Sequence, residues 1–383
     1  MRRQVILSGT AGVLIALSTM LGGAAANADD VTATGSGWHP PTCGKVTSDG
    51  SLTFTWSAGH YLTATTTQPR PIQIVSDVEA LAAPDTLLAV DDFGKLSTSR
   101  DAGCTWTKIA QLEGQPPYSI TAAGGASAYV WSRANDDRLY RVDGTTVTEL
   151  PRIPVAQVGN LLALAVDGSH LRTVTSTGVV LDSADGGQTF QRRGVTPTPV
   201  LGWDVWGYEG SIVGDLDHIV LGTSSDGVFT TFDGGLTWAK ATMSAEPKHR
   251  INIFSVATSP ADGNVVWAEG IDTTELDQGG TRAQGRHIYR STDGGRTFTA
   301  AVDHDPAVVT LTNGVPLAPH PTDPDVVYFE FGTWFAGYGT DLFEYDASTG
   351  KLGVAHNNHD GINAIAFNPA YPQVMYLGLT EVR

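Results

Sequence analysis

An eight-residue pattern, Ser/Thr-x-Asp-x-Gly-x-Thr-aromatic or a close variant of it, occurs four times in the chain. The copies occupy residues 99–106, 183–190, 231–238 and 291–298. Glycine at the fifth position supplies the positive φ that a tight hairpin needs, and the aspartate can accept hydrogen bonds from the turn amides. The threonine and the aromatic residue favour the start of a new strand. Each copy therefore predicts a β-hairpin.

Three degenerate copies complete a series that runs through the whole chain. Their aspartates are Asp49, Asp143 and Asp346, and successive aspartates of the series lie 42 to 60 residues apart. Repeats of this length are typical of rings of small sheets. The 44 glycines and 20 prolines also disfavour long helices. The sequence therefore predicts an all-β fold, a seven-bladed β-propeller of four-stranded antiparallel blades.

The end of the chain provides only half of a blade. Residues 362–369 and 374–378 read as two strands with no pair after them, whereas residues 45–47 and 52–56 read as a pair with no partners before them. We expect the N-terminal strands to pair with the C-terminal strands, which closes the ring and leaves no exposed edge. The whole of residues 43–383 is then one propeller domain.

The first residues have the three parts of an export signal. Arg2 and Arg3 precede an apolar run at residues 5–21, and small residues end at Ala28. Polar residues interrupt the run, so a cleaved signal peptide at residues 1–28 is favoured over a membrane anchor. Residues 29–42 are expected to be a flexible segment. The protein is thus predicted to be secreted, where the two cysteines, Cys43 and Cys104, would form a disulfide between the closing blade and its neighbour.

The charge of the chain limits its partners. The 23 Lys and Arg residues face 40 Asp and Glu residues, which gives a formal net charge of −17. Binding to nucleic acid needs clustered positive charge, so it is not expected. No cofactor, metal or membrane contact is predicted either, and the chain is expected to be a monomer.

The repeated hairpin is the Asp-box, or BNR repeat, and the chain resembles secreted seven-bladed Asp-box propellers over residues 43–383. In that family the boxes are structural, so the resemblance assigns no catalytic role to Asp101, Asp185, Asp233 and Asp293. Within the family, the length, composition and two cysteines are similar to those of streptomycete propellers that bind thermolysin-type metalloproteases and promote their self-digestion. The resemblance implies a protein-binding function without catalysis.

An enzyme is the alternative, because sialidases and other glycosidases also carry Asp-boxes. The Arg152-Ile-Pro154 segment resembles a sialidase motif, but it lies in mid-chain, after two or three repeats, where a linker between blades is favoured. A glycosidase needs two carboxylates about 5 to 10 Å apart. The candidate carboxylates are Asp272, Glu275, Asp277, Asp303, Asp305 and Asp360.

Two short segments have metal-like residue types. His356, His359 and Asp360 precede the strand at residue 362, and Asp272, Glu275 and Asp277 have the spacing of a calcium loop. Ordinary hydrogen bonding in turns is the favoured interpretation of both.

The loops on the face opposite the hairpins are the candidate surface for a partner. Three of them lie on neighbouring blades, and the residues expected to contact a partner are Glu275, Leu276, Asp277, Trp334, Phe335, Tyr338, Lys248 and Arg250. Aromatic side chains suit a protein interface, although the three aromatic residues can also fold back into their blade. A second aromatic run, residues 203–208, is expected to pack between blades. Gln68 is predicted to lie in an exposed loop that a transglutaminase can reach.

Overall fold

The computed structural model describes residues 54–56, 62–63, 75–134, 136–154, 159–197, 211–212, 216–244, 249–277, 285–303, 316–332, 340–357, 360–372 and 374–381. The chain divides into two units, Met1–Gly37 and Trp38–Arg383, and all described residues belong to the second. Several predicted features lie outside them: the signal peptide and residues 29–42, Cys43, the strand at 45–47, Gln68, residues 203–208, Lys248, Asp305, Trp334, Phe335, Tyr338 and His359.

The described residues form seven β-sheets, which we number as blades 1 to 7 in chain order. The strands of the first three blades follow in sequence. Blade 1 contains β2 (Val75–Ala80), β3 (Leu87–Asp91), β4 (Lys95–Ser99) and β5 (Thr107–Gln111). Blade 2 contains β6 (Tyr118–Ala122), β7 (Ser127–Ser132), β8 (Leu139–Asp143) and β9 (Thr146–Glu149). Blade 3 contains β10 (Leu161–Asp167), β11 (His170–Thr175), β12 (Val179–Ser183) and β13 (Gln191–Val195).

The next three blades repeat this plan. Blade 4 contains β14 (Ser211–Ile212), β15 (Ile219–Gly222), β16 (Val228–Thr231) and β17 (Ala239–Lys240). Blade 5 contains β19 (Ile251–Thr258), β20 (Val266–Asp272), β21 (Arg286–Ser291) and β22 (Thr297–Asp303), with β18 (Thr242–Met243) as a fifth, outer strand. Blade 6 contains β23 (Leu317–Pro319), β24 (Val326–Gly332), β25 (Thr340–Asp346) and β26 (Lys351–Asn357).

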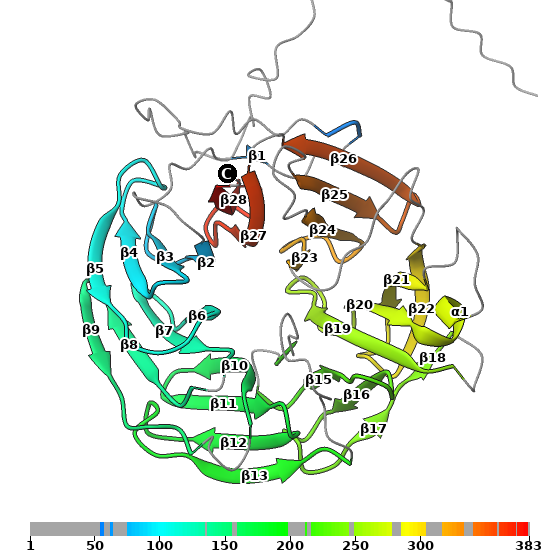
Figure 1. The fold of residues 1–383 in the computed structure, drawn as a ribbon, viewed down its shortest axis with the longest axis horizontal. Coiled ribbons are helices and arrows are strands. Elements are labelled where there is room, and N and C mark those ends of the chain that lie inside the picture. The colour runs from blue at the N-terminus through cyan, green and yellow to red at the C-terminus, as the bar shows by residue number, and fades with distance from the viewer. Residues whose placement is uncertain are drawn as a thin grey trace, which may run out of the picture. The chain divides into compact units, whose positions relative to one another are not determined.

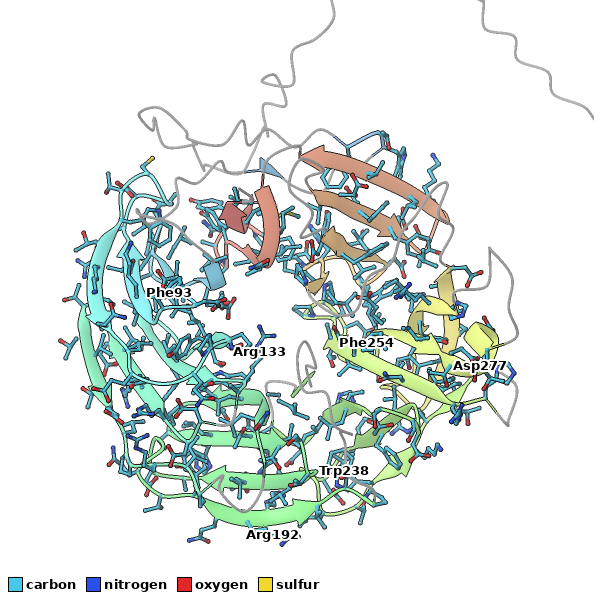
Figure 2. The ribbon with its side chains drawn as sticks, viewed as in Figure 1. Phe93, Arg133, Arg192, Trp238, Phe254 and Asp277 are labelled. Carbon is cyan, nitrogen blue, oxygen red and sulfur yellow. The ribbon has the colours of Figure 1, made fainter. Side chains whose placement is uncertain are left out.

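The blades are arranged in a ring, which Figure 1 shows face-on. Inner strands of successive blades contact one another, and β27 (Asp360–Phe367) of blade 7 contacts β2 of blade 1. The hydrophobic core lies between neighbouring sheets. For example, Trp267 of blade 5 packs in one cluster with Phe329 and Phe343 of blade 6. Figure 2 shows Phe254 on the inner side of the ring and Arg192 at its outer rim. The predicted all-β propeller is confirmed.

Blade 7 closes the ring, but with a different N-terminal strand from the one expected. It contains β27, β28 (Val374–Glu381) and β1 (Leu62–Thr63), and β1 runs parallel to β28. Closure by N-terminal and C-terminal strands is thus confirmed, while the pairing of residues 52–56 in this sheet is wrong for the part described, residues 54–56.

Residues 54–56 lie instead against β26 of blade 6. The Thr55 N–H donates to the Val354 carbonyl (2.9 Å), and Gly353 allows this approach because a Cβ there would lie 1.8 Å from the Trp56 carbonyl oxygen. Phe54 packs edge-on against Tyr328, with ring centroids 6.3 Å apart. Its ring joins the apolar cluster between blades 6 and 7. Partial burial of the Phe54 ring explains why residues 54–56 lie beside blade 6 and do not pair in the sheet of blade 7.

The four repeated hairpins connect the third and fourth strands of blades 1, 3, 4 and 5, as predicted. In the hairpin 231–238, the Thr231 hydroxyl donates to Asp233 Oδ1 (2.7 Å) and accepts the Gly235 N–H (3.1 Å). Thr237 donates its N–H to Asp233 Oδ1 (2.9 Å) and its hydroxyl to Asp233 Oδ2 (2.6 Å). The same four bonds recur around Asp101, Asp185 and Asp293. The aspartate therefore organises each turn.

The hairpin tips also join each blade to the one before it. The fourth residue of the pattern has positive φ and donates its N–H within its own blade, as Gly234 does to the Asp217 carbonyl (2.9 Å). Its carbonyl faces the preceding blade. The Gly186 carbonyl accepts from the Tyr129 hydroxyl (3.3 Å), and the Gly294 carbonyl accepts from the Thr230 hydroxyl (3.1 Å).

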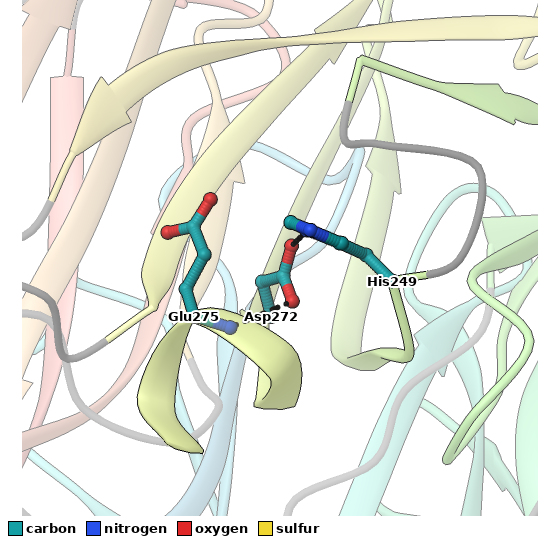
Figure 3. A group of neighbouring side chains, drawn as sticks. All are labelled: His249, Asp272 and Glu275. Atoms are coloured by element: carbon teal, nitrogen blue, oxygen red, sulfur yellow. Dashed lines mark hydrogen bonds and ion pairs between the residues drawn. The ribbon is translucent and has the colours of Figure 1, made fainter. Parts of the chain in front are cut away.

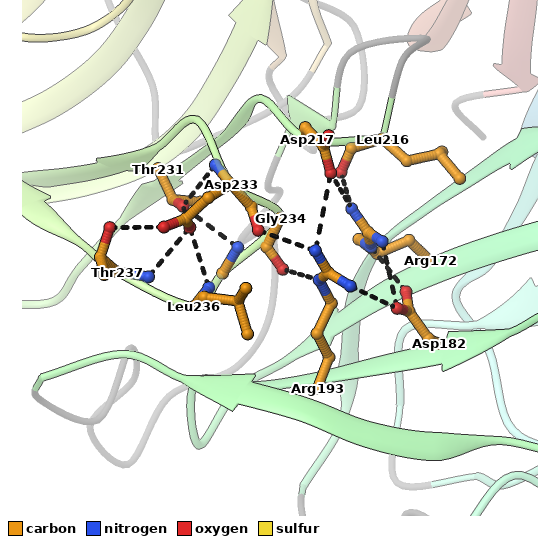
Figure 4. A network of polar contacts seen from close by, with 11 residues as sticks. Arg172, Asp182, Arg193, Leu216, Asp217, Thr231, Asp233, Gly234, Leu236 and Thr237 are labelled. Carbon is orange, nitrogen blue, oxygen red and sulfur yellow. Dashed lines mark hydrogen bonds and ion pairs between the residues drawn. The ribbon is translucent and has the colours of Figure 1, made fainter.

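Two arginines strengthen this junction between blades 3 and 4 (Figure 4). Arg193 donates to the carbonyl oxygens of Gly234 (2.9 Å) and Asp233 (2.9 Å). Arg172 is buried between Asp182 of its own blade (2.6 Å) and Asp217 of the next (2.9 Å). Charged groups in such paired geometry are stabilised despite their burial.

Cys104 lies in the first hairpin, and no cysteine among the described residues is free. Because Cys43 lies outside those residues, the Cys43–Cys104 pairing stays a prediction.

Gly235→Ala tests the close approach of the hairpin tip to the preceding blade. Gly235 has φ +90°, and a Cβ there would lie 2.6 Å from Val180 Cγ2 of blade 3. Gly168 is the matched control, since it also has positive φ (+58°) but has no atom within 4 Å of its Cβ position. We expect Gly235→Ala to lower the free energy of unfolding by about 2–5 kcal/mol and Gly168→Ala by about 1–2 kcal/mol. Urea unfolding measures both, and equal losses would show that the approach does not matter.

Asp185→Asn tests the hairpin aspartate through pH. Hydrogen bonds from the Thr189 hydroxyl and N–H and from Ser183 lower the pKa of Asp185 to about 2, from an ordinary value of 3.8. A lowered pKa means that the stability from this carboxylate is present above about pH 4 and is lost as the pH falls through 2. We expect the wild type to lose more stability than Asp185→Asn between pH 5 and pH 2. Exposed Asp167 provides the control, because Asp167→Asn should keep the wild-type pH dependence of urea unfolding.

Candidate functional site

Two loops opposite the hairpins meet at a short helix in blade 5. The helix α1 (Thr273–Asp277) follows β20, and residues 249–250 precede β19. Thr273 donates its N–H and its hydroxyl to the Arg250 carbonyl, both at 2.9 Å, and the Arg250 N–H donates to the Thr274 hydroxyl (3.1 Å). The two loops therefore lie side by side, and we call this region the α1 corner.

Asp272 is the centre of the α1 corner (Figure 3). Its side chain is fully buried, with 0% exposed. Oδ1 accepts the N–H groups of Thr274 (2.9 Å) and Glu275 (3.2 Å), which caps the start of α1. Oδ2 lies 2.5 Å from His249 Nδ1. The carboxylate thus fixes both the helix and the neighbouring loop.

His287 forms a second link, between two carboxylates. Its Nε2 lies 3.1 Å from Glu275 Oε2, and its Nδ1 lies 2.8 Å from Asp303 Oδ1. Tyr289 lies beside it, with ring centroids 5.3 Å apart. Burial raises the pKa of Tyr289, and the carboxylates of Asp272, Glu275 and Asp303 raise it further. The hydroxyl of Tyr289 is therefore neutral over the physiological pH range.

The predicted partner residues within the described chain do come together at the α1 corner. Arg250 and Asp277 form an ion pair (3.5 Å) on the surface, with 67% and 70% of their side chains exposed. Glu275 and Leu276 belong to the same helix. The contribution of Lys248 and of the aromatic residues Trp334, Phe335 and Tyr338 stays a prediction, since they lie outside the described residues.

Four of the six candidate glycosidase carboxylates have partners among the described residues. Asp272 uses both of its oxygens in the contacts above, Glu275 and Asp303 contact His287, and Asp277 contacts Arg250. Asp360 begins β27, whereas His356 belongs to β26. This arrangement favours a charged binding surface over an acid and base pair aimed at a common substrate.

His249, Asp272 and Glu275 form a group with the residue types of a metal site. Each offers one ligand atom, and these atoms lie within 4.8 Å of one another. The sequence did not indicate His249 or His287, because neither has a metal-like or catalytic neighbour in the sequence. The contact between the two loops brings His249 to Asp272, whereas His287 meets Asp303 as its cross-strand partner in the β21–β22 hairpin.

A pocket of about 370 Å³ lies on blade 3, next to the hairpin of residues 183–190. Its lining includes His170, Arg172, Asp182 and Arg193. The arginines are already paired with aspartates, as described above, so their charge is compensated. The pocket lies beside a hairpin, at the structural face of the ring, and contributes nothing to the α1 corner.

Two further glutamates lie partly buried within strands and were not anticipated. Burial and nearby Asp77 raise the pKa of Glu79, on β2, to about 8. Burial also raises the pKa of Glu330, on β24, well above its ordinary value. The sequence does not indicate either raised pKa, since a charged residue in a strand is normally expected to face water.

The chain is 45% identical over 361 residues to the dispase autolysis-inducing protein of Streptomyces mobaraensis, which covers 94% of this chain and 93% of that protein. No family model matches the chain. Within the described residues, no helix has the length and apolar character needed to cross a membrane.

Solved structures with a similar fold have diverse functions. An ancestral GH74 enzyme matches with a TM-score of 0.56 and 14% identity, and the match covers 82% of this chain but only 44% of that enzyme. YCF48 bound to a D1 peptide matches with a TM-score of 0.53 and 14% identity, covering 82% of this chain and 93% of that one. Hydrazine synthase of Kuenenia stuttgartiensis matches with a TM-score of 0.58 and 12% identity, covering 83% and 99%. At such low identity these matches show the fold alone.

Asp272→Ala tests whether this buried carboxylate holds the α1 corner together. Loss of a helix cap and of a buried partner for His249 is expected to lower the free energy of unfolding by about 2–5 kcal/mol. Asp277→Ala, in the same helix, removes only an exposed ion pair and should cost less than about 0.5 kcal/mol. Urea unfolding gives both values. Hydrogen exchange at residues 273–277 should accelerate in Asp272→Ala alone, and unchanged exchange would refute the capping role.

Proposed function

The chain belongs to the family of the dispase autolysis-inducing protein, and from this we propose that it is a secreted propeller without catalytic activity that binds dispase-like and thermolysin-type metalloproteases and induces their self-digestion or inhibits them. The observation that carries the proposal is the 45% identity over 94% of the chain. Identity of this extent over both chains supports a shared mode of action as well as a shared fold.

The α1 corner is the surface that we propose for the protease. It lies on the face opposite the hairpins, and its exposed ion pair of Arg250 and Asp277 offers both charges to a partner. We include Lys248, Glu275 and Leu276 in this surface, together with the aromatic loop that contains Trp334, Phe335 and Tyr338. Aromatic and arginine side chains supply much of the binding energy in protein interfaces.

The other finer expectations are part of the same proposal. A cleaved segment at residues 1–28 accounts for secretion, and a Cys43–Cys104 disulfide suits an extracellular chain. Gln68 is proposed as a site for a transglutaminase, and the protein is proposed to act as a monomer.

Binding to an immobilised, inactivated thermolysin-type metalloprotease tests the proposed surface. We expect the Arg250→Ala, Asp277→Ala double variant and the Trp334→Ala, Phe335→Ala, Tyr338→Ala triple variant each to weaken binding about tenfold or more. Leu236→Ser is the control, because Leu236 is 60% exposed on a hairpin of the opposite face. If binding survives in both surface variants but fails in Leu236→Ser, the protease binds the hairpin face, and the proposed surface at the α1 corner is wrong.

The runner-up function is binding or cleavage of glycans, as in Asp-box glycosidases. The four Asp-box hairpins, which glycosidases also carry, are the feature that favours it. Turnover of sialosides or glucans by the chain, without binding to the metalloprotease, would replace the proposed function with this one.

A further inference from the structure

We propose that His249, Asp272 and Glu275 form a binding site for a divalent transition metal, with zinc as the ion that fits best. The ligand atoms of the three side chains lie within 4.8 Å of one another. In a tetrahedral zinc site, bonds of about 2.0–2.2 Å place the ligand atoms about 3.3–3.6 Å apart. Rotation of partly exposed Glu275 brings its carboxylate closer, and the contact of 2.5 Å between His249 Nδ1 and Asp272 Oδ2 lengthens by about 1 Å to admit the ion.

Asp272 is held in a fixed position, so part of the proposed metal site is preorganised. Oδ1 is held by the amides of Thr274 and Glu275, so Oδ2 is the oxygen that faces His249. His249 is held in turn because Arg250, next to it, is bonded to Thr273 and Thr274 at the start of α1. Two of the three ligands are thus set in place by main-chain contacts before an ion arrives.

Glu275 is oriented from its other side. His287 contacts Glu275 Oε2 through Nε2 (3.1 Å) and Asp303 through Nδ1 (2.8 Å). A chain of this kind, in which a ligand carboxylate is hydrogen-bonded by a residue that is itself held, is the usual support of metal ligands in proteins. His287 and Asp303 are therefore positioning residues for the site.

The donor set selects the class of metal. One imidazole nitrogen and two carboxylates suit zinc, whereas calcium takes six to eight oxygen ligands and does not favour nitrogen. A calcium loop through Asp272, Glu275 and Asp277 is disfavoured, since the Asp277 carboxylate lies against Arg250 (3.5 Å). His249 Nδ1 and Asp272 Oδ2 are in direct hydrogen-bond contact in the structure, and zinc would replace that hydrogen bond.

The inference is independent of the proposed function, because it is tested without a protease. Calorimetric titration of the chelator-treated full chain with zinc chloride should show one site. His249→Ala and Glu275→Gln should each weaken zinc binding about tenfold or more. His170→Ala is the matched control, because His170 is an exposed histidine of blade 3 outside the group, and it should bind zinc as the wild type does.

X-ray absorption of the zinc-loaded wild type checks the ligands without any variant. One imidazole with carboxylate or water oxygens in the zinc coordination shell is expected, and two or more imidazoles would overturn the assignment. The proposal is also overturned if the wild type binds no zinc, if His249→Ala binds zinc as tightly as the wild type, or if calcium binds more tightly than zinc. Failure of the wild type to bind zinc would not contradict the proposal that the protein binds a metalloprotease.

Discussion

Blades 3, 4 and 5 are each joined to the blade before them by side-chain hydrogen bonds to the main chain of a hairpin tip. At Gly186, Gly234 and Gly294 the carbonyl accepts a hydrogen bond from the preceding blade, while the N–H donates within its own blade. Positive φ at these positions lets the N–H bond within the blade while the carbonyl faces the preceding one, and the glycine that follows lets the tip approach the neighbouring sheet. The same turn geometry therefore joins blades 2 to 5 at their hairpin face, and the connections between second and third strands emerge on the opposite face.

The first hairpin differs where the ring closes. Ala102 replaces the fourth-position glycine, keeps a positive φ of 54° and is buried among apolar residues of blades 1 and 7. Its methyl group adds apolar contact at the junction where blade 7 relies on β1, a strand of only two residues. We infer that packing against the closing blade offsets the strain of a left-handed alanine.

The sequence correctly predicted the features that repeat along the chain. It did not predict features that depend on contacts between segments far apart in the sequence. The four hairpins and the last two strands, β27 and β28, lie where the pattern placed them, because turn chemistry and alternation are local properties. The parallel strand β1 and the docking of Phe54 beside blade 6 depend on which apolar gap the N-terminal segment fills, and local alternation carries no information on that choice. The sequence indicated Glu275, Asp277 and Arg250 but not His249, whose partner Asp272 comes from another loop. It did not indicate His287 either, although His287 lies opposite Asp303 across a predicted hairpin.

The two faces of the ring are under different constraints. On the hairpin face, backbone groups and paired arginines join blades 2 to 5, so substitution of those arginines weakens the ring. On the face of the α1 corner, the buried carboxylate of Asp272 supports a helix whose outer charges, Asp277 and its partner Arg250, take no part in joining blades. A surface of this kind can change its partner without altering the ring, which explains how one propeller fold is compatible with enzymes and with binding proteins.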